Sequence, residues 1–149
     1  MRSVLLATCA LAAACGGPEN KLEGSIGESY SLAFQRVAIR QQGDYLLIEY
    51  QRDAAGGTEK VCKVVLDTRG ATLKADSSVT GDDFLARVTV SRVALTGGDF
   101  PAVERGSLHF DKLVLQDRGP AEGSFDVVFV GGYSLHGEFA GGVAVVPTS

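Results

Sequence analysis

The chain has 149 residues, with 18 acidic and 14 basic residues, two histidines, three cysteines and a formal net charge of −4. This length suits one domain of ordinary size rather than two. The acidic balance, without any long basic tract, argues against nucleic acid as a partner.

The first fourteen residues have the pattern of a secretory signal peptide. Arg2 gives a basic start, residues 4–11 are mostly apolar, and Ala12, Ala13 and Ala14 are the small residues expected before a cleavage site. The apolar stretch is far shorter than the roughly 20 residues that a membrane-spanning helix requires. We therefore expect residues 1–14 to be removed from the mature chain.

The segment LAAAC at 11–15 resembles the end of a bacterial lipoprotein signal, in which a cysteine after small residues receives a diacylglyceryl group. It departs from the family pattern because Leu11 lies four residues before Cys15 instead of three. The resemblance implies lipid attachment at Cys15 and a lipid-anchored tether over residues 15–21. It also implies a location in the bacterial cell envelope, anchored to a membrane on the periplasmic side or at the outer surface.

Two alternatives to Cys15 lipidation stay open. Cys9 is a competing acceptor because Leu6, Ala7 and Thr8 precede it, and ordinary secretory cleavage after Ala14 fits the same alanines. Under lipidation Cys62 has no partner in the mature chain, so we expect a buried thiol. Without lipidation, Cys15 and Cys62 could form a disulfide.

Residues 22–149 are predicted to form a single all-β domain. Alternating apolar residues are interrupted by glycine-containing turns, and no helical pattern lasts for three turns. We expect an antiparallel β-sandwich of about eight strands, some of them bulged, with a small up-and-down β-barrel as the alternative. The expected strands are 22–26, 30–40, 45–52, 60–67, 84–95, 107–116, 124–130 and 134–146, the last with a break at Gly141-Gly142.

Three expected strands share one pattern: SLAFQRVAI at 31–39, RVTVSRVAL at 87–95 and SLHFDKLVL at 107–115. Their apolar positions change parity midway, so a β-bulge in each strand is needed to keep one apolar face. The bulges should lie near residues 35–36, 91–92 and 111–112. The predicted core positions are Phe34, Val37, Val90, Val93, Phe110 and Leu113. The central cations Arg36, Arg92 and Lys112 are interpreted as solvated flanking charges rather than an anion site.

The usual signatures of enzymes and cofactor sites do not occur in the sequence, so no cofactor is expected. Ser134 in GGYSLHG lacks the following x-Gly of a nucleophile elbow and is interpreted as a hairpin serine. Asp82, Asp83 and Asp99 lack the alternating oxygen ligands of a known calcium loop, so we assign them to ordinary turns.

The hairpin SFDVVFVGGYSLHGEF at 124–139 carries the one constellation of metal-ligating residues. A loop centred on Gly132 pairs Phe125 with Phe139 and puts Asp126 opposite Glu138, with Val128 opposite His136. Asp126, His136 and Glu138 then share the outer face, where they could bind a divalent metal ion. His109 and Asp111 could complete the site if their strand is adjacent. The alternative is a solvated strand face, which we favour.

These patterns favour a non-enzymatic binding or structural module, held at a bacterial membrane by its lipid anchor. The expected partner is an envelope protein or a glycan. Two other functions stay open: a small β-barrel carrier of an apolar ligand, and a metal-dependent enzyme built on Asp126, His136 and Glu138.

Overall fold

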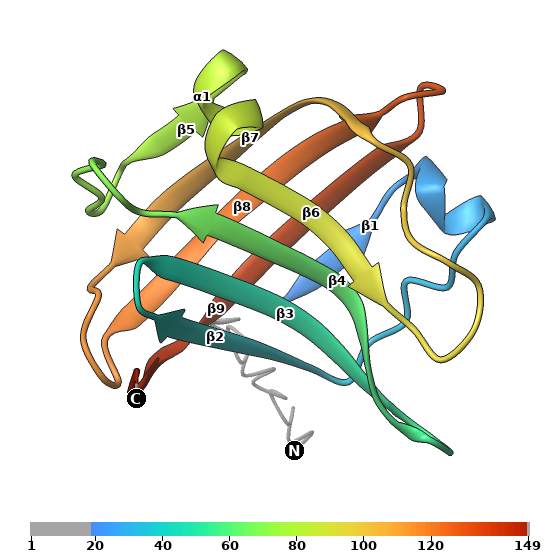
Figure 1. The fold of residues 1–149 in the computed structure, drawn as a ribbon, viewed down its shortest axis with the longest axis horizontal. Coiled ribbons are helices and arrows are strands. Elements are labelled where there is room, and N and C mark those ends of the chain that lie inside the picture. Colours follow the sequence, from blue (N-terminus) through green and yellow to red (C-terminus); the bar gives the residue numbers. More distant parts are fainter. Residues whose placement is uncertain (1–18, 149) are drawn as a thin grey trace, which may run out of the picture.

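A computed structural model describes residues 19–148, which form a curled, mostly β structure (Figure 1). The strands and helices, in chain order, are β1 (Lys21–Glu23), the short 3-10 helix η1 (Ser25–Glu28), β2 (Arg36–Gln42), β3 (Tyr45–Ala54), β4 (Gly57–Asp67), β5 (Ser78–Thr80), α1 (Gly81–Arg87), β6 (Val88–Val93), β7 (Val103–Leu113), β8 (Pro120–Phe129) and β9 (Ser134–Val146). The all-β prediction is confirmed.

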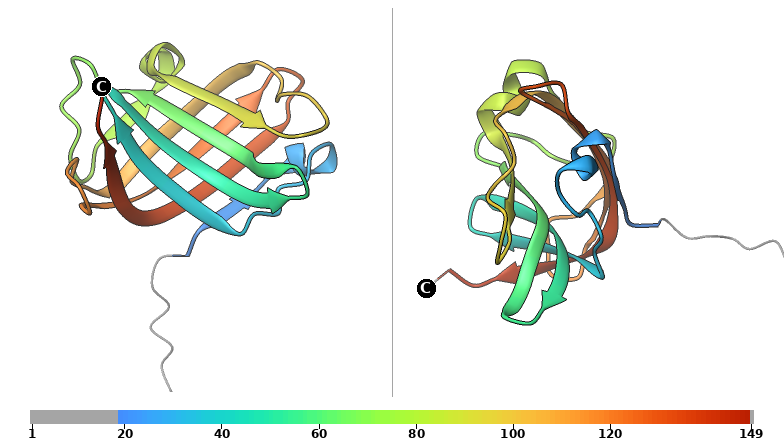
Figure 2. Two further views of the ribbon diagram at one scale, coloured as in Figure 1. Left: turned by 60° about the horizontal axis from the view of Figure 1, so that its bottom comes forward. Right: turned by 90° about the vertical axis from the view of Figure 1, so that its right-hand side faces the viewer.

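The strands form one sheet in the order β5-β7-β8-β9-β2-β3-β4-β6, with β1 added beside β9. The sheet curls into a half-barrel, so that β2, β3, β4 and β6 form a front layer over a rear layer of β5, β7, β8, β9 and β1 (Figures 1 and 2). Neighbouring strands are antiparallel except β2 and β9, which run parallel. The two expected layers are therefore parts of one continuous mixed sheet.

Strand β9 joins the two layers and has the bounds predicted from the sequence. It pairs with β8 as far as Gly142 and with β2 from Val143 onward. The expected break at Gly141-Gly142 is thus the point where β9 passes from the rear layer to the front layer.

Three expected strands are partly helical or irregular. The first ends at Glu23, and its expected last residues, Ser25 and Ile26, belong to η1. Residues 84–87 belong to α1, where Asp82 and Asp83 lie in the first turn and Arg87 lies in the last, so the charges suit the helix dipole. Arg87 also pairs with Asp83 one turn earlier, at 2.7 Å. Residues 30–35 are not a strand, and β2 begins at Arg36. The short strand β5 was not predicted.

Large side chains from both layers fill the space between them. Phe110 and Phe139 meet edge to face within the rear layer, and Tyr50 of the front layer meets Phe125 of the rear layer in the same way. The largest fully buried aromatic residues are Tyr50, Phe84, Phe110, Phe125, Phe129 and Phe139. The half-barrel therefore encloses a packed core.

The predicted bulges have mixed outcomes. In β7 the register shifts between Phe110 and Lys112, and both Phe110 and Leu113 are buried, which confirms the bulge at 111–112. Near Ser91-Arg92 the one extra residue lies on the partner strand β4, between Lys60 and Lys63. Val93 is 53% exposed, so its assignment to the core was wrong.

The remaining core predictions hold in part. Val90 is buried, whereas Phe34 and Val37 are partly buried and pack against the core. A bulge at 35–36 does not form because the residues before Arg36 lie outside the strand. Phe34 reaches the core from this irregular segment, where its ring meets Tyr50 edge to face at 5.0 Å.

Candidate functional site

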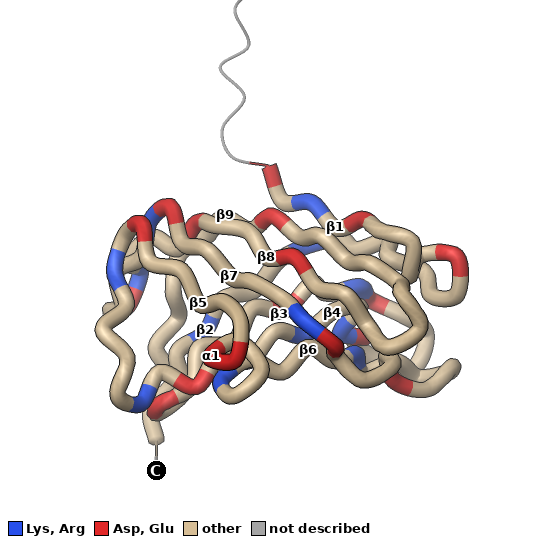
Figure 3. Tube along the Cα trace, turned by 90° about the horizontal axis from the view of Figure 1, so that it is seen from above, with Lys and Arg blue, Asp and Glu red and all other residues tan. Residues whose placement is uncertain are grey.

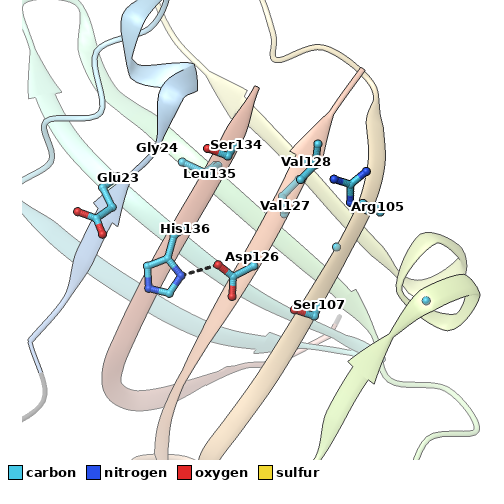
Figure 4. Close-up of a pocket in the computed structure, with 12 residues that line it drawn as sticks. Glu23, Gly24, Arg105, Ser107, Asp126, Val127, Val128, Ser134, Leu135 and His136 are labelled. Atoms are coloured by element: carbon cyan, nitrogen blue, oxygen red, sulfur yellow. Dashed lines mark hydrogen bonds and ion pairs between the residues drawn. The ribbon is translucent and has the colours of Figure 1, made fainter. Parts of the chain in front are cut away.

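The outer face of the rear layer carries a hollow of about 710 Å³, which we call the outer groove (Figure 4). It crosses β1, β9, β8 and β7 and extends to the start of α1. Its volume lies within the range of small-molecule pockets. The polar residues that line it are Glu23, Arg105, Ser107, Asp126, Ser134 and His136.

Strand register brings these residues together from distant parts of the sequence. Asp126 lies opposite Ser107 on one side and opposite His136 on the other, and His136 in turn lies opposite Glu23. These four residues form one row across four strands. The next row runs from Arg105 through Val128 to Ser134.

His136 lies between two carboxylates. Its Nδ1 is 2.8 Å from Asp126 Oδ1, and its Nε2 is 3.5 Å from Glu138 Oε1. The predicted convergence of Asp126, His136 and Glu138 on the outer face therefore occurs (Figure 4 shows the first contact). Because both ring nitrogens face carboxylates, the imidazole links the two acidic side chains, by a hydrogen bond to Asp126 and a longer contact with Glu138.

The hairpin register differs from the predicted one by two residues. Asp126 lies opposite His136 and Ser124 lies opposite Glu138, because the chain turns through Val130, Gly131 and Gly132 with the Phe129 amide donating to the Tyr133 carbonyl at 2.8 Å. Both glycines have positive φ values, 100° and 85°, which permit this tighter turn. A shift of two residues keeps every side chain on its predicted face.

The metal-site hypothesis stays a prediction. Within residues 19–148, no group of three or more His, Cys, Asp or Glu side chains has an arrangement that could hold a metal ion. His109 and Asp111 do not complete the site, because β8 separates their strand β7 from β9. His109 instead contacts Ser78 Oγ at 2.7 Å and Asp111 at 3.4 Å.

Arg105 is a groove residue that the sequence did not reveal. The register of β7 against β8 shifts between Val103 and Arg105, and the Arg105 side chain is 69% exposed. Its ion pair with the adjacent Glu104 is 3.6 Å long, which exceeds the length of a good hydrogen bond. The guanidinium can therefore turn toward a ligand in the groove.

Two inward-facing groups fix the position of β9 beneath the site. A side chain at Gly137 would place its Cβ 2.2 Å from Phe125 Cε1, so the ring lies directly over this glycine. The Tyr50 hydroxyl donates to the Glu138 carbonyl at 2.6 Å. Burial is the main cause that raises the pKa of Tyr50 above its ordinary value, so the phenol stays a donor. The front layer thus holds the strand that carries His136 and Glu138.

The front layer has a different ionic cluster on its own outer face. Glu49 is fully buried there, 2.8 Å from both Arg40 and Lys60, and it accepts a hydrogen bond from Gln51. Burial by itself raises the pKa of Glu49, but Lys60, Gln51 and Arg40 outweigh it and hold the pKa below its ordinary value. We call Glu49, Arg40, Lys60 and Gln51 the Glu49 cluster.

The three central cations of the repeated pattern are not brought together. Arg36 pairs with Asp53, Lys112 pairs with Glu122, and Arg92 donates to the Gly97 and Gly98 carbonyls. Each cation has its own local partners, in agreement with the interpretation as flanking charges.

The remaining candidates take part in the local structure. Asp82 and Asp83 lie in the first turn of α1, so their assignment to an ordinary turn was wrong. Asp99 Oδ1 accepts hydrogen bonds from the backbone amides of Arg92 and Phe100, as expected for a turn residue. Ser134 hydrogen-bonds with Ser25, consistent with a hairpin serine. Cys62 is fully buried, which raises the pKa of its thiol and confirms the predicted buried thiol. Cys15 lies outside the described residues.

In the described part of the chain, no helix is both long and apolar enough to span a membrane. Comparisons of this chain with protein-family models, curated proteins and solved structures gave no match.

Proposed function

We propose that this chain is a non-enzymatic binding module, held at a bacterial membrane by a lipid on Cys15, that binds a component of the cell envelope through the outer groove. The observation that carries the proposal is the contrast between the groove and the core. The groove is a hollow of about 710 Å³ lined by Arg105, Asp126 and His136, whereas aromatic side chains fill the inside of the half-barrel.

The packed core makes the module a better interpretation than a carrier of an apolar ligand. A carrier needs an interior wide enough for its cargo. Here Tyr50, Phe110 and Phe125 are each at most 1% exposed between the two layers. A ligand is more readily accepted on the outer face, where the groove already exists.

Membrane attachment is supported by the sequence around Cys15. The small residues before it and the Gly16-Gly17-Pro18 segment after it fit a processed and lipidated N-terminus. Stable anchoring needs more than one acyl chain, because each buried CH₂ contributes only about 0.8 kcal/mol.

The test is intact-mass analysis of protein extracted from membranes. We expect a chain that begins at Cys15 and carries acyl groups, and a Cys15→Ser variant that leaves the membrane fraction without unfolding. An unmodified wild-type chain in the soluble fraction would contradict the anchor.

A metal-dependent enzyme on Asp126, His136 and Glu138 is the second candidate, because these side chains lie together, although they contact one another and do not form a metal-binding arrangement in the described structure. Calorimetric titration with zinc, manganese and calcium tests it, with His136→Ala as the control variant. Binding tighter than the millimolar range that His136→Ala abolishes would favour the enzyme over the module. Heat signals that are the same in both proteins would remove this candidate.

A further inference from the structure

We propose that the ligand of the outer groove is the zwitterionic headgroup of a phospholipid, a phosphate beside a primary ammonium as in phosphatidylethanolamine. The headgroup would belong to the membrane that holds the chain. This inference rests on the proposed function and names the ligand of the same site.

The groove presents opposite charges at a separation that suits a small zwitterion. Arg105 lies opposite Val128, and Asp126 is two residues from Val128 on the same face. Diagonal neighbours of this kind are about 7–8 Å apart at the backbone, within reach of long side chains. A guanidinium recognises phosphate through two parallel hydrogen bonds, and a carboxylate accepts from an ammonium. Glu23 adds a second carboxylate at the opposite flank, where it pairs with Lys21 at 2.9 Å (Figure 4).

The carboxylate side of the groove is fixed, and the cation side is adjustable. His136 holds Asp126 Oδ1 at 2.8 Å, and within residues 19–148 no hydrogen bond to Asp126 Oδ2 is found. That oxygen is therefore available to an ammonium group. Arg105 is mostly exposed and makes only the long contact with Glu104 among the described residues, so it can close over a phosphate.

The start of the described chain places this face near the anchor. Asn20 Oδ1 accepts a hydrogen bond from the Ala140 amide at 2.8 Å, and Glu19 lines a second, smaller hollow beside Ser124 and Glu138. Cys15 lies four positions before Glu19, and an extended chain of that length spans at most about 14 Å. A lipid on Cys15 would therefore keep the outer face of β8 and β9 close to the headgroups.

The overall charge of this face selects against anionic lipids. Carboxylates recur along β8 and β9 (Figure 3). On the outer face of β1, β7, β8 and β9 the acidic residues are Glu23, Asp111, Glu122, Asp126 and Glu138, and the basic residues are Lys21, Arg105 and Lys112. An acidic surface is repelled by a negatively charged bilayer, whereas a zwitterionic headgroup carries no net charge.

The experiment is vesicle flotation of the mature chain with Cys15→Ser, so that any binding comes from the groove and not from the anchor. Vesicles of phosphatidylcholine are compared with vesicles that also contain phosphatidylethanolamine or phosphatidylglycerol. We expect binding to the phosphatidylethanolamine vesicles, competed by soluble glycerophosphoethanolamine. Phosphatidylcholine should bind weakly because its methylated nitrogen cannot donate a hydrogen bond to Asp126.

Three variants locate the binding. Arg105→Ala and Asp126→Asn should each weaken binding about tenfold, the effect of losing one charge-assisted hydrogen bond. Arg36→Ala removes the same cationic side chain from the outer face of the front layer and should leave binding unchanged. Circular dichroism confirms that each variant is folded.

Equal binding to phosphatidylethanolamine and phosphatidylcholine would overturn the inference, as would stronger binding to phosphatidylglycerol or binding that Arg105→Ala leaves unchanged. The anchor is judged separately by intact mass. If Cys15 is acylated but the headgroups are not discriminated, this inference is wrong and the anchor remains. If the headgroups are discriminated but the wild-type chain is never acylated, the anchor is wrong and this inference remains.

Discussion

The outer faces of the two layers use the same kinds of residue in different ways. On the front layer, Glu49 is fully buried and its charge is neutralised by Arg40 and Lys60. On the rear layer, the Asp126 side chain is 67% exposed beside His136, and Arg105 lies across a hollow from them. The comparison teaches that a carboxylate closed in by its partners serves the fold, whereas carboxylates beside an open groove can meet a ligand.

The largest effect on stability should come from a side chain added at Gly137, which lies under the Phe125 ring. Gly137→Ala forces a Cβ to within 2.2 Å of Phe125 Cε1, so the strand carrying His136 must move. We expect a loss of about 3 kcal/mol in the free energy of unfolding, at the upper end for overpacking. Urea denaturation measures it.

Gly142→Ala is the matched control on the same strand. Its added Cβ would lie 3.8 Å from the nearest atoms, those of the Arg118 backbone, so the change should be close to neutral. If the two variants were equally stable, Phe125 would not fix the position of the site strand.

The second prediction compares the loss of unfolding free energy when a lysine is replaced by methionine on the outer face of each layer. Lys60→Met keeps the covering side-chain length but leaves the buried Glu49 carboxylate with Arg40 as its remaining ion-pair partner in the described structure. We expect a loss of about 2 kcal/mol in unfolding free energy, because a buried charge loses part of its compensation.

Lys112→Met removes the exposed pair with Glu122 on the rear layer and should cost less than about 1 kcal/mol. Thermal or urea unfolding of both variants gives the comparison. Similar losses for the two would show that the Glu49 cluster is no more structural than the pairs on the groove face.

A smaller effect should follow from Tyr50→Phe, which removes the hydrogen bond to the Glu138 carbonyl and keeps the aromatic packing. The expected loss is about 1 kcal/mol of unfolding free energy. Tyr45→Phe is the control, because Tyr45 is 42% exposed and its hydroxyl has only a long contact, at 3.5 Å, from Arg69. An unchanged stability in Tyr50→Phe would mean that this bond does not tie the front layer to β9.

The smallest effect on stability, counted per residue, should be the pH dependence of the unfolding free energy that the ion pairs of the front layer cause. A hydrogen bond from Arg69 is the main cause that lowers the pKa of Asp67 to about 2, and Arg36 lowers that of Asp53 in the same way. Because these pKa values lie below those of the unfolded chain, near 4, the stabilisation is complete above pH 4 and is lost as the pH falls toward 2.

The urea midpoint of unfolding should therefore decrease from pH 5 to pH 2. In the Asp67→Asn variant the midpoint should decrease less steeply. A midpoint that stays constant down to pH 2 in the wild-type chain would show that the ion pairs of the front layer do not stabilise the fold.

The sequence predicted what depends on side-chain alternation and missed what depends on partner strands. The change of parity in SLHFDKLVL was enough to place the bulge at Asp111-Lys112. The faces of Phe125, Asp126 and His136 were also correct, because a register shift of two residues leaves them unchanged.

The exposed position of Arg105 follows from an irregularity between β7 and β8 that leaves no pattern in the sequence. The helical state of residues 84–87 was missed because the whole helix α1 has only seven residues, too few for a clear helical period. The lipid on Cys15 stays a prediction, since that residue lies outside the described chain.

The most direct test of the central claim, that the groove face is turned toward the membrane, is the depth of two spin labels in the lipidated protein. Lys112→Cys labels the outer face of the rear layer and Thr89→Cys that of the front layer, while the fully buried Cys62 should stay unlabelled. In phosphatidylethanolamine vesicles, the label at position 112 should lie closer to the bilayer by power-saturation measurements. A label at position 89 that lies closer, or equal depths for both, would contradict the account.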